Sequence, residues 1–148
     1  MSIVSITIAA KNEEKNIAKS LSSALNQSYS PIEIFLIDDT SADRTVEVAR
    51  KCYEMHTGRI PFEIISNEKN LGFSGGHNVG MKYALDHGAD YIVILNNDIY
   101  TDKYLLEELV KAAEDDEKIA MVAPKIYFAK GHEFHKDRYK EKELGKVF

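Results

Sequence analysis

The alternation of strand-like and helix-like segments is the feature that most constrains the fold of this chain. Runs of β-branched and aromatic residues, which predict strands, lie at 3–8, 32–37, 62–65, 91–95 and 119–123. Between them, apolar residues recur at helical spacing, as at Ile17, Leu21 and Leu25. Strands that alternate with helices predict a mainly parallel sheet with helices on both faces. We therefore expect an α/β fold of three layers, α/β/α.

The remaining predicted elements follow from the same spacing rules. Helical spacing is present at Val46–Tyr53, Val79–Ala84 and Leu105–Ala112. The segment Tyr91–Leu95 is apolar at every position. A strand with this pattern is typical of the centre of a parallel sheet, where both of its faces are buried. We therefore expect this strand to be central.

Length and composition exclude several classes of protein. The chain has 148 residues, which fits one domain with a real core. Its net charge of −5 gives no general affinity for nucleic acid. Cys52 is the single cysteine, so an internal disulfide and a thiolate zinc cluster are both excluded. Ordinary composition, at 44% hydrophobic and 29% charged residues, indicates a soluble globular protein.

The sequence also bears on location. No segment is apolar over the roughly 18 residues that a transmembrane helix needs. The first predicted strand begins close to Met1, which leaves no room for a signal peptide before it. We therefore expect a cytoplasmic protein without a transmembrane segment, and peripheral contact with a membrane stays open.

Polar clusters follow four of the predicted strands. They lie at Ala9–Asn12, Asp38–Asp43, Asn67–Asn78 and Asn96–Asp98. In open α/β sheets, ligands bind outside the carboxyl ends of the strands, so the four clusters predict one pocket. Carboxylate, Asn and Gly residues suit a nucleoside diphosphate that is held through a metal ion.

Two adjacent carboxylates, Asp38 and Asp39, emerge at the end of the second predicted strand. They repel each other unless a cation or a hydrogen-bond donor holds them. One of them could cap the following helix, because Asp is a favoured N-cap residue. Since Thr40, Ser41 and Asp43 already offer caps, two more Asp residues exceed what capping needs. One carboxylate could instead accept a hydrogen bond from a nucleobase.

A third acidic position, Asp98, follows the most hydrophobic strand. Mg²⁺ is commonly held by one or two carboxylates together with substrate phosphates and water. Asp98 with its flanking Asn residues therefore suits a metal that arrives with a nucleotide. The alternative is a turn that precedes a helix at Lys103–Ala113, and on this segment alone the two interpretations carry equal weight.

The stretch Asn70–Gly80 contains four glycines and predicts a loop that approaches a ligand closely, followed by a helix N-terminus that favours anions. It lacks the Gly-Lys-Ser/Thr ending of a P-loop and the spacing of a dinucleotide fingerprint. His77 alone is more typical of a helix start than of a ligand or base. Gly80 could serve close packing of the helix on the sheet.

Together, these motifs resemble those of the family 2 glycosyltransferases, which have the GT-A fold, and of their rhamnosyltransferase-like branch. The acidic motif Asp-Asp-x-Ser-x-Asp-x-Thr is matched at residues 38–45, and the glycine-rich motif at residues 70–78. Asn96–Asp98 is similar to the branch's variant of the Asp-x-Asp metal motif. The first motif departs from the family pattern, because Ala9–Asn12 lacks the usual Pro and Tyr. The resemblance runs from about Val4 to Tyr127.

The resemblance implies a site for a nucleotide-diphosphate sugar, UDP- or dTDP-linked, with a Mg²⁺ or Mn²⁺ cofactor. By this likeness Asp39 contacts the base, Asp98 binds the metal, and Asn97 lies near the ribose or sugar. The acceptor implied is a glycan or a lipid-linked molecule of unknown identity, and nucleic acid is not expected as a partner. The candidate nucleotide-binding residues are Ala9, Lys11, Asn12, Asp38, Asp39, Asn70, Gly72, Gly75, Gly76, Asn78 and Asn97.

Family members carry the catalytic base in an acceptor-binding lobe beyond the metal motif. We expect residues 1–128 to form the nucleotide-sugar-binding domain and 129–148 to be a polar extension or the start of a missing lobe. No residue is assigned as the base, because nothing fixes Glu133, Asp137 or Glu141 near Asp98. We therefore expect these 148 residues to transfer sugar weakly or not at all.

Three functions compete at this point. The first is an inverting, metal-assisted glycosyltransferase that acts on an acceptor hydroxyl. The second is a non-catalytic nucleotide-binding module or a truncated donor-binding fragment. The third, a nucleotidyltransferase, ranks lower because Ala9–Glu14 contains no Gly, unlike the usual glycine-rich loop of that class.

Overall fold

The computed structural model describes residues 1–127, so the predicted boundary at residue 128 and the tail 129–148 lie outside the described part. Four parallel strands form one sheet in the order β3-β2-β1-β4. The elements in chain order are β1 (Val4–Ala10), α1 (Ile17–Leu25), β2 (Ile32–Asp38), α2 (Thr45–Glu54), β3 (Phe62–Ser66), α3 (Gly72–Asp86), β4 (Tyr91–Asn96) and α4 (Leu105–Ala113).

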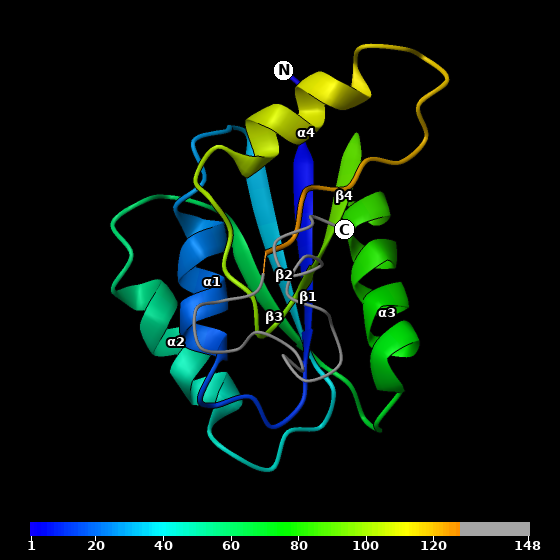
Figure 1. Ribbon diagram of the computed structural model, residues 1–148. Helices are drawn as coiled ribbons and strands as arrows, with labels where there is room; N and C mark the ends of the chain where they lie inside the picture. Colours follow the sequence, from blue (N-terminus) through cyan, green and yellow to red (C-terminus); the bar gives the residue numbers. More distant parts are fainter. Residues whose placement is uncertain (128–148) are drawn as a thin grey trace, which may run out of the picture.

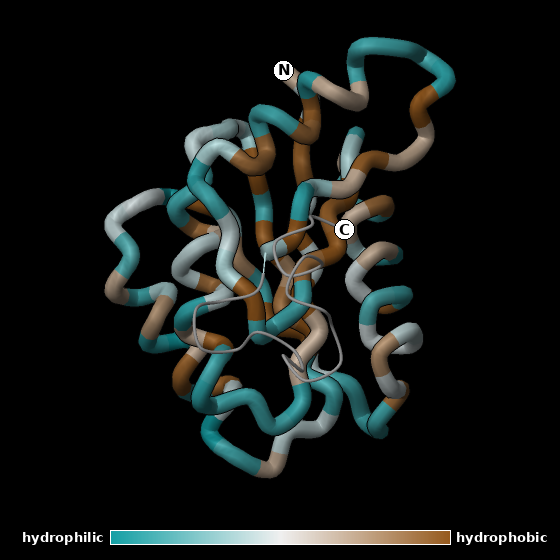
Figure 2. Tube along the Cα trace, in the orientation of Figure 1, coloured by the Kyte–Doolittle hydropathy of each residue, from teal (hydrophilic) through white to brown (hydrophobic). Residues whose placement is uncertain are grey.

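Helices cover both faces of the sheet, as the alternation predicted (Figure 1). On one face, Ile6 and Ile8 of β1 pack in the main core with Leu21 of α1 and Leu106 of α4. Helix α2 packs against α1 on this side. On the other face, a smaller cluster joins β2 to α3 through Phe35, Ile37 and Ala84. Figure 2 shows hydrophobic residues gathered along the strands inside these layers. The three-layer α/β/α fold is confirmed.

Strand β4 is at an edge of the sheet, so the prediction of a central position for Tyr91–Leu95 is wrong. Strands β1 and β2 are central, and their side chains are almost all buried. In β4 only Leu95 is buried, and Ile94 is 49% exposed. Helix α3 contacts β1 and β2 more extensively than β4. An apolar run shows that a strand has two apolar faces, but it does not fix the place of that strand in the sheet order.

The prediction of a fifth strand at 119–123 is also wrong. Residues 119–127 are irregular, and Ile119 donates its N–H to the Asp116 carbonyl in a turn after α4. Met121 is 89% exposed. A β-branched run becomes a strand only when it pairs, and within residues 1–127 this segment pairs with no strand of the sheet.

Helix α3 begins at Gly72, so most of the glycine-rich stretch is helical and not the loop that we expected. A Cβ added to Gly76 would lie 3.1 Å from the Ala9 Cβ, and one added to Gly80 would lie 2.9 Å from the Thr7 Cβ. Because these glycines are one turn apart, they form the face of α3 that lies close against β1. Tertiary packing thus overrides the low helix propensity of glycine, and the packing role suggested for Gly80 is confirmed.

The register places the carboxyl ends of the strands together. Ala10 pairs with Asp38, Asp38 pairs with Ser66, and Ala9 pairs with Asn96. The connections that follow these strands therefore meet at one end of the sheet, beyond the carboxyl ends of all four strands, at the lower end of the view in Figure 1. We call this end of the sheet the strand-end edge.

Candidate functional site

Asp39 joins the strand-end loops of β2 and β3. Its side chain is 4% exposed. Its Oδ1 atom accepts hydrogen bonds from Asn67 Nδ2 at 3.0 Å and from the Leu71 N–H at 2.8 Å. Its Oδ2 atom accepts one from the Gly72 N–H at 2.8 Å. The carboxylate therefore caps the start of α3 from another strand, which satisfies N–H groups that a helix start otherwise leaves unpaired.

The ionised form of Asp39 is favoured in this environment. Burial raises the pKa of its carboxyl, but hydrogen bonds from Leu71, Asn67 and Gly72 and the charge of Lys11 outweigh burial, so the pKa is lowered from 3.8. Lys11 itself is exposed. A fixed carboxylate and an exposed ammonium group thus lie in the same part of the edge.

Asp38 has a more local role. It is 6% exposed, and its Oδ1 accepts a hydrogen bond from the Ser41 N–H at 3.2 Å. The suggestion that Asp38 or Asp39 caps the following helix is wrong. The N–H of Thr45, the first residue of α2, is instead bonded to Asp43 Oδ1 at 2.9 Å. The two adjacent carboxylates are thus held by separate sets of N–H groups.

Asn97 and Asp98 follow β4 and lie beside the end of β1. Asn97 donates its Nδ2 group to the Ala9 carbonyl at 2.6 Å. Asp98 is exposed, while the turn before α4 uses Asp102, whose Oδ1 accepts the Tyr104 N–H at 2.9 Å. The predicted turn is therefore present at Asn97 and Asp98, but Asp102 is the residue that serves the start of the helix. Asp98 presents its carboxylate to solvent at the strand-end edge.

A single exposed carboxylate fits a divalent metal that arrives with a diphosphate. Mg²⁺ usually keeps several waters and takes only one or two protein carboxylates, and the substrate phosphates supply other ligands. Within residues 1–127, no three His, Cys, Asp or Glu side chains form a ready-made metal cage. Asp98 offers the hard oxygen that Mg²⁺ or Mn²⁺ prefers, so the donor set is compatible with such a metal.

The start of α3 lies against the end of β1. Gly72 has a φ of 70°, which glycine adopts without strain, and its N–H is also 3.0 Å from Asn70 Oδ1. Gly76 packs on Ala9, whose carbonyl binds Asn97. Helix N-termini favour anions, and the anion at this one is the Asp39 carboxylate, which takes the Leu71 and Gly72 N–H groups. The predicted residues Gly75 and Asn78 lie in the same first turns, half-buried and exposed respectively.

Asn12 belongs to the loop after β1 but does not offer its amide oxygen to solvent. The oxygen accepts the Ala42 N–H at 2.8 Å, and the Asn12 N–H donates to Ser41 Oγ at 2.9 Å. Asn12 has a φ of 56°, in the left-handed region that Asn tolerates better than most residues. Its contacts within the chain tie two strand-end loops together.

The structure thus brings most of the predicted residues to one edge, and it gives roles to motif residues that were not among the predicted nucleotide-binding residues. These residues are Asn67, which orients Asp39, and Asp43 and Thr45, which bind the loop after β1. Asn67 follows β3 directly, so its strand-end position was an available signal. Glu14, a partner of Asp43, is 29 residues away in the sequence, and nothing in the spacing identifies this contact.

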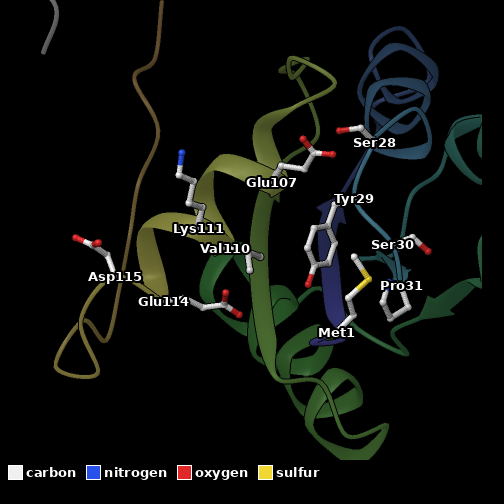
Figure 3. Close-up of a pocket in the computed structure, with 10 residues that line it drawn as sticks. All are labelled: Met1, Ser28, Tyr29, Ser30, Pro31, Glu107, Val110, Lys111, Glu114 and Asp115. Atoms are coloured by element: carbon white, nitrogen blue, oxygen red, sulfur yellow. The ribbon is translucent and has the colours of Figure 1, made fainter.

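A separate hollow lies at the other end of the sheet. Figure 3 shows this cavity of about 700 Å³ between the segment before β2 and helix α4. Its wall combines Tyr29 and Val110 with the charged side chains Glu107, Lys111 and Glu114. None of its lining residues belongs to the strand-end edge, so it has no part in the candidate site.

The fold is that of the GT-A class of glycosyltransferases. The model of glycosyl transferase family 2 matches residues 5–147, and the chain belongs to this family. The uncharacterized glycosyltransferase EpsJ of Bacillus subtilis is 31% identical over 115 residues, which cover 78% of this chain and 31% of EpsJ. The Escherichia coli glucosyltransferase WfaP is 37% identical over 100 residues, which cover 68% of this chain and 37% of WfaP.

A third relative, the chondroitin synthase of Pasteurella multocida, is 32% identical over 120 residues, or 81% of this chain and 12% of the synthase. The chain thus spans 12% to 37% of the length of these three relatives. WfaP is described as a UDP-Glc:α-D-GlcNAc-diphosphoundecaprenol β-1,3-glucosyltransferase.

Solved structures show the same fold. TarS of S. aureus in complex with UDP-GlcNAc superposes with a TM-score of 0.66 at 24% identity, over 78% of this chain and 32% of that one. The mannosyltransferase PcManGT from Pyrobaculum calidifontis, in complex with GDP-Man and Mn²⁺, superposes with a TM-score of 0.65 at 22% identity. The match covers 76% of this chain and 32% of PcManGT. Among residues 1–127, no helix has the length and apolar character needed to cross a bilayer.

Proposed function

We propose that this chain binds a nucleotide-diphosphate sugar at the strand-end edge and serves its transfer to an acceptor hydroxyl with inversion. The observation that carries the proposal is that the connections after β1, β2 and β4 meet at this edge. Asp39 fixes the start of α3, and Asn97 fixes the segment of Asp98 to the end of β1. A capped helix start and an exposed candidate metal ligand therefore lie along one edge, and Asp98 is the group that is open to a metal-bound diphosphate.

The parts of the donor have separate places in this proposal. The base lies by Ala9, Lys11 and Asp39, and the diphosphate lies at Asp98. A divalent metal held by Asp98 would stabilise the negative charge of the leaving diphosphate. UDP and dTDP are the nucleotides we expect from the sequence resemblance. The UDP-sugar named for WfaP and the UDP-GlcNAc bound to TarS support a uridine donor.

Calorimetry tests the donor site. We expect UDP or dTDP to bind in the presence of Mg²⁺ or Mn²⁺, and a chelator to weaken the binding. Asp98→Ala should remove most of the metal-dependent part, with a stability change within about 0.5 kcal/mol because the residue is exposed. Asp115→Ala, another exposed Asp that lies at the opposite end of the sheet, is the matched control. Equal binding with and without a chelator would contradict the metal role.

A donor-binding module without transfer is the second candidate, and one observation favours it. The two buried carboxylates at the edge, Asp38 and Asp39, are occupied by hydrogen bonds from their own chain. Neither is free to take the proton from an acceptor hydroxyl. No residue was assigned as the base from the sequence, and the acidic tail residues Glu133, Asp137 and Glu141 lie outside the described residues. Turnover of a UDP-sugar with Mn²⁺ and an acceptor, measured beside slow donor hydrolysis, separates transfer from binding alone.

A further inference from the structure

The loop after β1 is fastened to the acidic motif by hydrogen bonds that we call the loop brace. Two bonds involve Asn12, which accepts the Ala42 N–H and donates to Ser41 Oγ. Two more follow along the chain. Glu13 donates its N–H to Thr45 Oγ1 at 2.7 Å. Glu14 donates its N–H to Asp43 Oδ2 at 3.1 Å. Consecutive residues 12–14 are thus each held by the segment 41–45.

Asp43 is the centre of the loop brace. Its Oδ2 receives the Glu14 N–H, while its Oδ1 receives both the N–H and the hydroxyl of Thr45. Thr45 is fully buried. A carboxylate that accepts from N–H groups makes hydrogen bonds about twice as strong as those between neutral groups. Asp43 therefore links the loop after β1 to the buried start of α2.

The loop brace also holds an unfavourable backbone in place. Asn12 and Thr40 both have positive φ, at 56° and 62°. Such residues persist only where the surrounding structure fixes them, and they are frequent at functional sites. The turn at Asn12 directly follows Lys11, whose charge lowers the pKa of Asp39. The loop brace therefore fixes the backbone on the C-terminal side of Lys11.

We propose that Asp43 is a positioning residue for the nucleotide site. Asp43 holds Ala9–Lys11 in the binding conformation before the ligand arrives. The inference rests on the proposed function. Asp43 acts through the Glu14 N–H and does not touch the nucleotide. A loop that is ordered in advance binds more tightly, because its ordering entropy is not lost on association.

Asp43→Asn tests the inference while it keeps the size of the side chain. An amide has one acceptor oxygen, which can still accept the hydrogen bonds from Thr45. Its NH₂ group then faces the Glu14 N–H, and that hydrogen bond is lost. We expect UDP affinity with Mn²⁺ to fall roughly tenfold, as when a loop must be ordered on binding. Amide hydrogen exchange at Asn12–Glu14 should become faster in the same variant.

The matched control is Asp90→Asn. Asp90 Oδ2 accepts the Ile3 N–H at 2.7 Å, so it makes the same kind of bond at the opposite end of the sheet. We expect this variant to lose stability without any change in nucleotide affinity. A loss of affinity in Asp43→Asn no larger than that in Asp90→Asn would reduce Asp43 to a general structural residue and overturn the inference.

A double-mutant cycle that combines Asp43→Asn with Lys11→Ala, read out as nucleotide affinity, separates positioning from a merely structural role. If Asp43 acts by positioning Lys11, the two losses of affinity are not additive, because the second change removes a contact already misplaced. Strict additivity would overturn the inference. Failure of the unaltered chain to bind UDP or dTDP would overturn the proposed function and this inference with it. If the unaltered chain binds the nucleotide and Asp43→Asn binds it equally well, the inference is overturned but the proposed function is not.

Discussion

Gly72 donates its backbone N–H to Asp39 Oδ2 over 2.8 Å, across 33 residues of chain. The bond joins the carboxyl end of β2 to the first residue of α3. Asp39 therefore has a folding role that its place in the acidic motif does not reveal. The base contact implied by the resemblance stays a prediction, and the two roles make different demands on the side chain.

Asp39→Asn separates these roles. From the sequence we expect a change of base preference that leaves metal dependence in place. The structure adds a loss of stability of about 1 kcal/mol, because an amide leaves at least one of the three partly buried N–H donors without an acceptor. Urea unfolding measures this loss. Asp86→Asn, at an exposed Asp paired with Lys82, is the control and should change stability by less than about 0.5 kcal/mol.

Thr40→Asn should stabilise the chain. Thr40 is a β-branched residue with a φ of 62°, a backbone conformation that Asn adopts more readily. Relief of this strain is worth about 1 kcal/mol and should raise the melting temperature. Thr101→Asn, at a threonine without positive φ, should give no such gain. A lower melting temperature for Thr40→Asn would show that its hydroxyl bond to the Asp39 carbonyl, at 2.6 Å, matters more than the strain.

Gly80→Ala should destabilise the chain by about 1–3 kcal/mol through overpacking. The added methyl group would lie 2.9 Å from the Thr7 Cβ and 3.2 Å from Ile37 Cγ1, so α3 would have to move away from the sheet. Thermal unfolding measures the effect. Ser74→Ala, at an exposed position on the same helix, is the comparison, and equal melting temperatures for the two variants would contradict the close packing of α3.

The stability of the chain should fall as the pH drops below about 6.5, the ordinary pKa of His. Burial lowers the pKa of His77, and within residues 1–127 neither of its ring nitrogens has a hydrogen-bond partner. The unfolded chain then binds a proton that the folded chain does not, so stability is fully present above pH 6.5 and declines toward the folded pKa. Urea midpoints at pH 7.5 and 5.5 should differ less in His77→Asn than in the unaltered chain.

His56→Asn is the control for this pH dependence. His56 lies in the connection between α2 and β3, away from the buried face of α3. We expect the shift of the urea midpoint between the two pH values to match that of the unaltered chain. A shift that is the same in all three proteins would exclude His77 as its source.

The sequence predicted the layers and the edge that carries the site because these depend on local patterns. β-branched runs and helical spacing identified four strands and four helices, and the strand-end rule brought Asp39, Asn97 and Asp98 to one edge. The start of α3 was missed because glycines are poor helix formers. Gly76 and Gly80 are in the helix because the sheet lies close against it, a contact that spacing does not encode.

Other differences have the same origin in long-range contacts. The edge position of β4 depends on pairing order, and an apolar run such as Tyr91–Leu95 fits several positions in a sheet. The loop brace is equally hidden, because Asp43 and Glu14 are far apart along the chain. The acidic motif drew attention to ligand binding, whereas Ser41, Asp43 and Thr45 bind their own protein.

The edge position of β4 has a consequence for the behaviour of the chain in solution. On the side away from β1, no strand within residues 1–127 pairs with β4, and Ile94 is half exposed there. An apolar strand with free backbone donors and acceptors is a template for β-pairing between molecules. Within residues 1–127, this side of β4 is therefore open to pairing with a further strand, from another part of the protein or from a second copy.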